Sequence, residues 1–397
     1  MNLTLEELAR RKEDFCRRMD SEFPDWSNAL IVGKVNQYYF AGSMQNALLI
    51  ITRDGGIFYF VRESYDRARK ESPLDCIYPM RSYRDAAEVV GAELGNIYVE
   101  ADIIPHSYVE RLRKSFSIDK IGALDSLVKY QRAVKSEYEM FYMEDCCRRS
   151  GKVLSEIVPT LLYEGMWESN LHHLVSGQII KHGHAGVVRF GAFQCEMLMG
   201  QITFGADSLF PNDFDGPTGS LGNGAYAPLF PSSERALKKG DLVLVDISVC
   251  RAGYNSDVTR LYSFGAKPAP EVLKLHRQCT DIQRRIADAL RPGAIPSKIY
   301  GDVMDTLSPD LVRNFMGFGA RRARFVGHGI GLTVDEYPVL ARGFDKPLEE
   351  NMTLAIEPKV GIENIGVVGF EDTYAVTPYG GRCLTGDGES FDIIVVD

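Results

Sequence analysis

Apolar and polar residues follow two different patterns along this chain, and each pattern predicts a type of element. Helical patterns, with apolar residues three and four apart, lie at 3–19, 104–116, 167–181, 270–290 and 297–307. Short apolar runs typical of strands lie at 29–33, 37–42, 46–52, 57–61 and 96–102. Asp54-Gly55, between two of these runs, predicts a hairpin. Ser136 and Glu139 form a capping box, which predicts that a helix begins at Glu137.

The chain from residue 241 onward is rich in β-branched and aliphatic residues. Its strand-like runs lie at 242–249, 257–264, 352–357 and 367–376. Together with the helical segments, these runs predict an α/β (α+β) chain. Because 397 residues are too many for one typical core, we expect two domains, 1–125 and 126–397, the first of them a mixed α/β unit.

Composition narrows the class of protein. The chain is 45% hydrophobic with a net charge of −9, which is typical of a globular protein and argues against a nucleic-acid partner. It has no apolar run of membrane-spanning length and no apolar signal core at its N-terminus, so no membrane association is expected. Eight scattered cysteines without CxxC spacing predict reduced thiols in a cytoplasmic protein.

Two pairs of carboxylates and one histidine carry the chemistry. Asp246 with Asp257, and Glu357 with Glu371, lie in strand-like runs joined by turns, so hairpins can bring the partners together. His328 lies between two glycines, which let the backbone approach a ligand closely. Four carboxylates and an imidazole at one point would repel unless positive charge lay among them, and hard divalent cations prefer oxygen-rich sites. The pattern therefore predicts a dinuclear metal hydrolase.

Each of these residues also has a simpler interpretation. Asp246 would cap a turn, Asp257 would pair with Arg260, and each glutamate would be half of a salt bridge. Basic partners are few, however, with Lys359 and Arg260 the obvious ones nearby. The five residues together, in this order, favour metal binding over separate ion pairs.

The motifs GDLVLVD, YNSDVTR, GHGIGL, AIEP and FEDT, in this order, resemble those of the pita-bread metallohydrolases. That family includes methionine aminopeptidase, aminopeptidase P, prolidase and their relative creatinase. The first part of the chain resembles the creatinase/prolidase-type N-terminal domain, and RAVKSEYE resembles the element between the domains. The resemblance covers essentially the whole chain. It implies a curved antiparallel sheet backed by helices, with the metals on its concave side, and a homodimer.

The resemblance also implies a role for each residue. Asp246 would bind one metal ion, His328 and Glu357 the other, and Asp257 and Glu371 both. A hydroxide held between the cations would attack an amide (C–N) bond of a small peptide. Glu357 and His328 would be the catalytic residues, with Glu357 accepting the proton of the nucleophile. The oxygen-rich ligands favour two divalent ions, manganese first, with cobalt, iron or zinc as the other candidates.

The substrate side departs from the peptidase pattern. The family's first extra histidine is missing, because no histidine lies between His184 and His276. A long loop, 205–231, occupies that region, and Asn212, Asp213 or Asp215 could replace the histidine as a substrate contact. The alternative is that the loop is a surface insertion or a dimer contact.

Two further positions depart from the family. Asp335, followed by Glu336, stands where a second histidine is usual, and Gly369 stands where many prolidase-like members carry arginine. An aspartate would repel a substrate carboxylate and favour an amine or guanidinium, with Glu336 as a second candidate contact. Alternatively, Arg342 would neutralise Asp335 in a structural role.

The resulting expectation is a metallohydrolase of the Xaa-Pro aminopeptidase/prolidase type. The altered substrate residues favour a small substrate other than an ordinary Xaa-Pro dipeptide. The alternative enzyme is a creatinase-like or ring-opening amidohydrolase acting on a small non-peptide. A non-catalytic pita-bread binding protein is the third possibility, but such proteins usually lack the ligand acids, and this chain keeps all of them.

Overall fold

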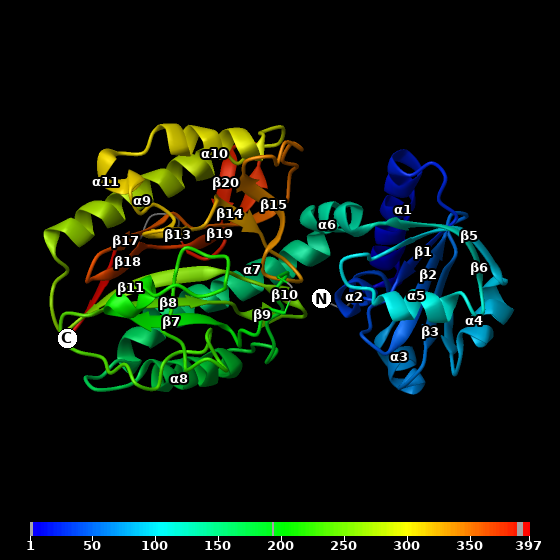
Figure 1. Cartoon of the computed structure of the whole chain (residues 1–397), viewed down its shortest axis with the longest axis horizontal. Helices are drawn as coiled ribbons and strands as arrows, with labels where there is room; N and C mark the ends of the chain where they lie inside the picture. Colours follow the sequence, from blue (N-terminus) through cyan, green and yellow to red (C-terminus); the bar gives the residue numbers. More distant parts are fainter. Residues whose placement is uncertain (1–2, 193, 387–391) are drawn as a thin grey trace. The chain divides into compact units, whose positions relative to one another are not determined.

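The computed structural model describes residues 3–192, 194–386 and 392–397. The chain divides into two compact units, Met1–Arg132 and Ala133–Asp397 (Figure 1). The division falls at the end of helix α6 (Asp125–Ala133), whereas the boundary expected from the sequence, between residues 125 and 126, lies at the start of this helix.

The first unit is built on a six-stranded mixed sheet with the strand order β4-β3-β2-β1-β5-β6. Neighbours β1, β2 and β3 are antiparallel, whereas β3–β4, β1–β5 and β5–β6 are parallel. The strands are β1 (Asn28–Ile31), β2 (Ala47–Thr52), β3 (Ile57–Val61), β4 (Ile77–Pro79), β5 (Glu93–Val99) and β6 (Ser117–Ala123). The helices are α1 (Leu5–Glu22), α2 (Lys34–Ala41), α3 (Tyr65–Glu71), α4 (Tyr83–Val90) and α5 (His106–Leu112).

The core of this unit lies between the sheet and helices α4 and α5. Leu30, Ile50 and Phe60 from the strands pack with Ala86 and Leu112 from the helices, and all five are buried. Burying such side chains stabilises the fold by about 1.5–3 kcal/mol each for the larger ones.

The prediction of a strand at 37–42 is wrong, because this segment belongs to helix α2. The carboxylate of Glu100 accepts hydrogen bonds from the backbone N–H groups of Val32 and Gly33 at 2.6 and 2.7 Å, at the start of this helix. Gly42 ends the helix in the left-handed region, with φ of 73°. Its aromatic residues are typical of a strand, but the distant Glu100 at its start and the local glycine at its end favour the helix.

The second unit contains two larger sheets, one ordered β21-β11-β8-β7 and the other β15-β14-β16-β19-β20, with the β17–β18 hairpin beside them. All their pairs are antiparallel except β11–β21. The strands are β7 (Gly200–Phe204), β8 (Leu242–Ile247), β9 (Cys250–Arg251), β10 (Tyr254–Asn255), β11 (Val258–Phe264), β12 (Gly317–Phe318), β13 (Arg321–Arg322), β14 (Phe325–Gly329), β15 (Glu336–Ala341), β16 (Thr353–Ile356), β17 (Lys359–Ile362), β18 (Gly366–Gly369), β19 (Asp372–Thr377), β20 (Gly380–Cys383) and β21 (Ile394–Val396).

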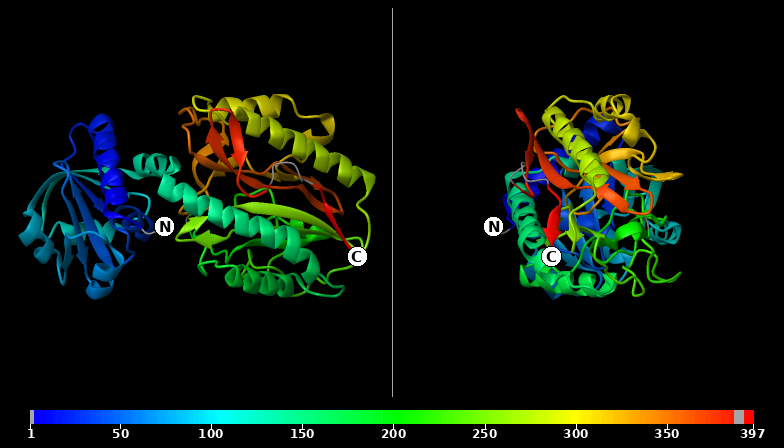
Figure 2. Two further views of the ribbon diagram at one scale, coloured as in Figure 1. Left: turned by 180° about the vertical axis from the view of Figure 1, so that it is seen from behind. Right: turned by 90° about the vertical axis from the view of Figure 1, so that its left-hand side faces the viewer.

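Helices cover the outside of both sheets. In the view from behind, α7 (Glu137–Lys152) runs along the sheet that contains β8 and β11 (Figure 2). Helix α8 (Glu168–Lys181) packs on β7, α9 (Pro270–Ala289) on β16, β17, β18 and β20, and α10 (Pro296–Asp305) on β15. A short helix, α11 (Pro309–Val312), follows. This arrangement confirms the expected mixed α/β fold, with sheets backed by helices.

Helix α7 begins as the capping box predicts. The hydroxyl of Ser136 accepts a hydrogen bond from the backbone N–H of Glu139, and the Glu139 carboxylate accepts one from the N–H of Ser136.

Candidate active site

The acidic residues lie at strand ends, as the sequence predicts. Strands β8 and β11 pair so that Asp246 lies opposite Thr259, and Asp257 directly precedes β11. Strands β16 and β19 pair in the same way, with Glu357 just after the first and Glu371 just before the second. A strand end leaves a side chain beside the sheet and not within its packed face, so acids can gather there.

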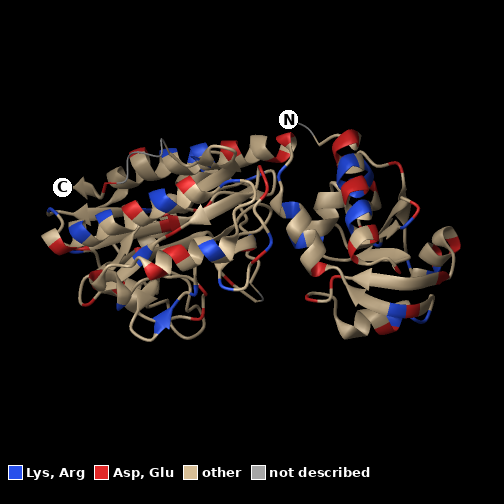
Figure 3. Cartoon of the chain, turned by 90° about the horizontal axis from the view of Figure 1, so that it is seen from above, with Lys and Arg blue, Asp and Glu red and all other residues tan. Residues whose placement is uncertain are grey.

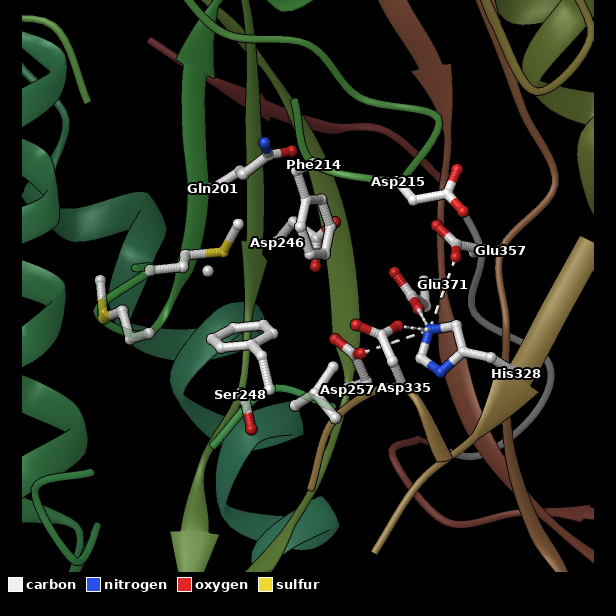
Figure 4. Close-up of a pocket in the computed structure, with 15 residues that line it drawn as sticks. Gln201, Phe214, Asp215, Asp246, Ser248, Asp257, His328, Asp335, Glu357 and Glu371 are labelled. Atoms are coloured by element: carbon white, nitrogen blue, oxygen red, sulfur yellow. Dashed lines mark ion pairs between the residues drawn. The ribbon is translucent and has the colours of Figure 1, made fainter. Parts of the chain in front are cut away.

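A short bridge between the two sheets brings the pairs together. Thr259 and Glu371 exchange backbone hydrogen bonds of 3.2 and 3.3 Å, and the Thr259 hydroxyl donates to the Glu371 carboxylate at 2.8 Å. The acids of both strand pairs therefore face one pocket, which they line together with His328 (Figure 4).

His328 is oriented toward the acids by its own backbone neighbour. Its Nδ1–H donates to the carbonyl oxygen of Gly329 at 3.0 Å, which leaves Nε2 directed at the pocket. Figure 4 shows this nitrogen surrounded by carboxylates. The distances from Nε2 are 3.7 Å to Asp257 Oδ2, 3.6 Å to Asp335 Oδ1, 3.6 Å to Glu357 Oε1 and 3.9 Å to Glu371 Oε1.

Three of these residues form a compact set of metal-ligand atoms. One atom from each of Asp257, His328 and Glu371 lies within 4.8 Å of the others, and all three residues are buried. Burial and the neighbouring carboxylates, Glu371 first among them, raise the pKa of Asp257 well above its usual range. Burial also raises the pKa of Glu371. Two buried carboxylates and an imidazole nitrogen fit one hard or borderline divalent cation.

Lys359 lies in the same cluster, although the sequence pattern indicates no role for it beyond that of a basic residue nearby. Its side chain is fully buried, and Nζ lies 3.1 Å from Asp246 Oδ2, 2.9 Å from Glu357 Oε2 and 2.8 Å from Glu371 Oε2. The lysine is the first residue of β17, directly after the motif that carries Glu357. Only the spacing of two residues from Glu357 could have indicated that the two side chains meet.

Arg260 does not pair with Asp257, contrary to the simpler interpretation of that aspartate. Its guanidinium donates to Asp372 Oδ1 at 2.7 Å and to the carbonyl oxygen of Glu371 at 2.9 Å. Asp372 and Arg260 thus neutralise each other beside the cluster. Any charge on Asp257 must therefore be compensated by other groups of the cluster.

The four candidate substrate residues divide into two groups. Asp335 and Asp215 line the pocket, and Asp335 Oδ1 lies 3.6 Å from His328 Nε2, although Asp335 is not one of the five expected ligands. Asp213 lines a neighbouring cavity instead. The carboxylate of Glu336 accepts a hydrogen bond from the backbone N–H of Thr333 at 2.8 Å and is not brought to the pocket.

The rest of the pocket wall is mostly apolar. Phe214, from the long loop, lines the pocket beside Asp246 in Figure 4. The other apolar lining residues are Phe190, Met197, Met199 and Val334. Gln201 and Ser248 add polar groups on the same side. The long loop 205–231 therefore contributes side chains to the pocket.

A buried Asp/His/Glu cluster at the junction of two sheets is the kind of site that a metal-dependent hydrolase uses. The family model "Metallopeptidase family M24" matches residues 142–378, and "Creatinase/Prolidase N-terminal domain" matches residues 17–134. The chain belongs to metallopeptidase family M24. The resemblance based on sequence motifs is thereby confirmed, as is the prediction of a metallohydrolase enzyme.

Several Xaa-Pro peptidases resemble the chain over nearly its whole length. An Xaa-Pro dipeptidase of Pyrococcus horikoshii is 25% identical, over 90% of this chain and 92% of its own. One of Pyrococcus furiosus is 24% identical, over 95% and 98%. Among solved structures, an Xaa-Pro dipeptidase from Bacillus anthracis matches with a TM-score of 0.79 at 19% identity, over 97% of this chain and 99% of that one. An X-Pro aminopeptidase from Thermotoga maritima matches with a TM-score of 0.77 at 21% identity, over 97% and 99%.

Surface and thiol features add to this description. In Figure 3, Lys and Arg residues are interspersed with Asp and Glu residues along the elements of the chain. All eight cysteines are free thiols. In the described part of the chain, none of the helices has the length and apolar character needed to cross a bilayer.

Proposed function

We propose that this protein is a peptidase of the Xaa-Pro dipeptidase/aminopeptidase type, which uses a divalent metal to hydrolyse an amide bond of a small peptide. The observation that carries the proposal is the convergence of Asp257, His328 and Glu371 on one point of the pocket. The names of the Pyrococcus relatives support the substrate class.

The ligand roles follow from the donor atoms. Asp257, His328 Nε2 and Glu371 would hold the metal, with Glu357 Oε1 near His328 Nε2. This donor set suits manganese, with cobalt, iron or zinc as alternatives. A divalent ion bound there supplies Lewis-acid chemistry, because it polarises a carbonyl group and acidifies water.

Glu357 would act as the proton acceptor. Its Oε1 faces the pocket near His328 Nε2, while its Oε2 is held by Lys359 at 2.9 Å, so the carboxylate has a fixed orientation. Burial raises the pKa of Glu357, which brings a glutamate closer to the range in which a base both accepts and releases a proton near neutral pH. The same carboxylate would deliver that proton to the nitrogen of the leaving group.

The acids of the pocket favour a substrate with a cationic group. Asp335 and Asp215 line the pocket outside the ligand set, and each would attract a free amino group and repel a carboxylate. A small peptide with a free amino terminus fits this environment. The second candidate, a small non-peptide amide carrying an amine or guanidinium, is favoured by the same Asp335 and by the absence of the peptidase histidine there.

The test is hydrolysis of a panel of Xaa-Pro dipeptides, Xaa-Pro tripeptides, creatine and cyclic amidines by the manganese-loaded protein. Wild type should cleave at least one compound, and Asp257→Asn should lower kcat/KM by at least about a hundredfold, the upper end of the loss seen for outer-shell ligand partners. Asp281→Asn, at an exposed position on α9, should retain wild-type activity. Turnover that is unchanged by a chelator and by Asp257→Asn would reject the metal-dependent mechanism.

We further propose that the enzyme is a cytoplasmic homodimer. The free thiols support a reducing compartment, and the family resemblance supports the dimer. The mass of the purified chain in solution, measured by light scattering, tests the second point directly.

A further inference from the structure

The ammonium group of Lys359 lies inside the acid cluster and not at its rim. Three carboxylates accept hydrogen bonds from Nζ, and they belong to Asp246, Glu357 and Glu371. The lysine side chain has no exposed surface. A buried charge is retained only when it is paired and hydrogen-bonded, and here each of the three ammonium protons can have its own acceptor.

The two glutamates divide their oxygens between two cation positions. Oε2 of Glu357 and Oε2 of Glu371 face Lys359, whereas Oε1 of each faces Nε2 of His328. Asp257 completes the second position, and Asp246 completes the first. The cluster thus has the two-centred form that the family resemblance implies, but a side chain already fills one of the centres.

A divalent ion does not fit beside this lysine. The oxygen atoms it would need from Asp246 and Glu371 are the ones that accept hydrogen bonds from Nζ, at 3.1 and 2.8 Å. Metal–oxygen bonds are about 2.0–2.6 Å long, so an ion bound there would lie within a few ångströms of the ammonium. Two such charges repel strongly in a buried site.

A separate observation, at Gly369, concerns the space that the Lys359 side chain occupies. Gly369 lies opposite Lys359 in the β17–β18 hairpin. A Cβ atom at residue 369 would lie 2.8 Å from Lys359 Cα and 3.0 Å from Lys359 Cγ. The lysine stem therefore occupies space beside residue 369 that is open only because that residue is glycine.

We propose that the ε-ammonium of Lys359 is a built-in cation that replaces one of the two metal ions, so that the centre takes a single divalent ion at Asp257, His328 and Glu371. The inference rests on the proposed function and makes it more specific. Asp246, in this arrangement, binds the lysine and not a metal. Lys359 acts as a positioning residue, because it fixes the orientation of the Glu357 carboxylate.

The experiment is a count of metal ions in the full chain after loading with excess MnCl₂ and desalting. Wild type should contain one Mn²⁺ per chain, with the electron paramagnetic resonance spectrum of an isolated ion. Lys359→Met, which keeps the length of the side chain and removes its charge, should contain two. Asp246→Asn should still contain one, and Asp257→Asn none. Lys135→Met is the matched control, since Lys135 is also a buried lysine, 3.6 Å from Glu336, and it should leave the count at one.

The outcomes separate this inference from the proposed function. Two Mn²⁺ ions per wild-type chain with a spin-coupled spectrum, together with active enzyme, would overturn the inference and leave the function in place. A folded Lys359→Met variant that still binds one ion would also overturn it. If that variant does not fold, Asp246→Asn decides, because loss of an ion there would show that Asp246 is a ligand. A wild type that binds no metal and shows no metal-dependent hydrolysis would reject both.

Discussion

At the scale of single residues, Glu371 shows how one carboxylate can serve several partners. One oxygen accepts hydrogen bonds from Thr259 and Lys359, and the other faces His328. Its backbone also joins the two sheets through Thr259. Because the side chain is held on several sides, little conformational entropy remains to be lost when a ligand binds.

Gly369 is the residue at which a small substitution should have a large effect. Gly369→Ala should lower the free energy of unfolding by about 2–4 kcal/mol, because φ of 134° strains an alanine and its Cβ would lie 2.4 Å from the Pro358 carbonyl oxygen. Thermal unfolding followed by circular dichroism measures the loss.

Gly343→Ala is the control for this substitution. Gly343 also has a positive φ, of 85°, but nothing lies within 4 Å of the position that a methyl group would take there. It should show only the cost of backbone strain, about 1 kcal/mol. Equal losses at the two positions would contradict the close contact around Lys359.

At the scale of elements, Arg321 holds the long loop over the pocket. It donates from Nε to the carbonyl oxygen of Asn212 and from Nη1 to that of Gly216, both at 2.9 Å, and these residues flank Phe214 and Asp215 of the pocket wall. Arg321→Met should raise KM about tenfold with a smaller change in kcat, because each of these charge-assisted bonds contributes about 1.5–3 kcal/mol and water replaces part of it. Steady-state kinetics on the substrate that wild type cleaves measures both constants.

Arg322→Met tests whether the effect is specific to the loop. Arg322 is the next residue, it is exposed, and its guanidinium donates only to the carbonyl oxygens of Val312 and Arg313 among the hydrogen bonds described for it. KM should stay at the wild-type value. Limited proteolysis should cut within 205–231 faster in Arg321→Met than in Arg322→Met, and equal rates would reject the anchoring role.

Elements with strong local patterns can be predicted from the sequence, and those that depend on distant contacts cannot. The five helical patterns and the hairpin at Asp54-Gly55 are all present in the structure. The prediction of a strand at 37–42 is wrong. The backbone N–H groups at the start of the helix found there donate to Glu100, which lies more than sixty residues away in the sequence. No local pattern contains such a contact.

The site shows the same limit. The four acids and the histidine can be placed together because each occurs in a recognisable motif in or beside a strand. The backbone of Asp335 has a φ of 63°, and this conformation determines that Asp335, and not Glu336, faces the pocket. The alternation of apolar and polar residues in a strand does not predict such a conformation. The direction of the Lys359 side chain depends in turn on the glycine opposite it.

At the scale of the whole molecule, stability should depend on pH through Glu168. Burial raises its pKa to about 8, although the backbone N–H groups of Phe204 and Ser232 donate to its carboxylate. The folded-state pKa lies above the unfolded value of 4.5, so the protonated form stabilises the fold below pH 4.5, and this stabilisation is lost as pH rises toward about 8. Tm should therefore fall as pH rises from about 4.5 to about 8 and level off above that.

Glu168→Gln should weaken this pH dependence. The variant will be less stable at every pH, since its amide N–H₂ faces a backbone N–H group, but its Tm should change less across the same range. Glu164→Gln, at an exposed position in the same segment, should keep the wild-type slope. Identical slopes for wild type and Glu168→Gln, measured by scanning calorimetry, would rule out Glu168 as the source.

The position of Lys359 has a consequence for how the protein behaves when metal is scarce. A chelator, or a cell depleted of metal, can remove a bound ion but cannot remove a side chain. The stripped protein would keep one positive charge among its acids, and Asp246, Glu357 and Glu371 would stay gathered around it. Reloading would then require capture of one ion by a site already assembled, so recovery of activity should follow first-order dependence on the concentration of added metal.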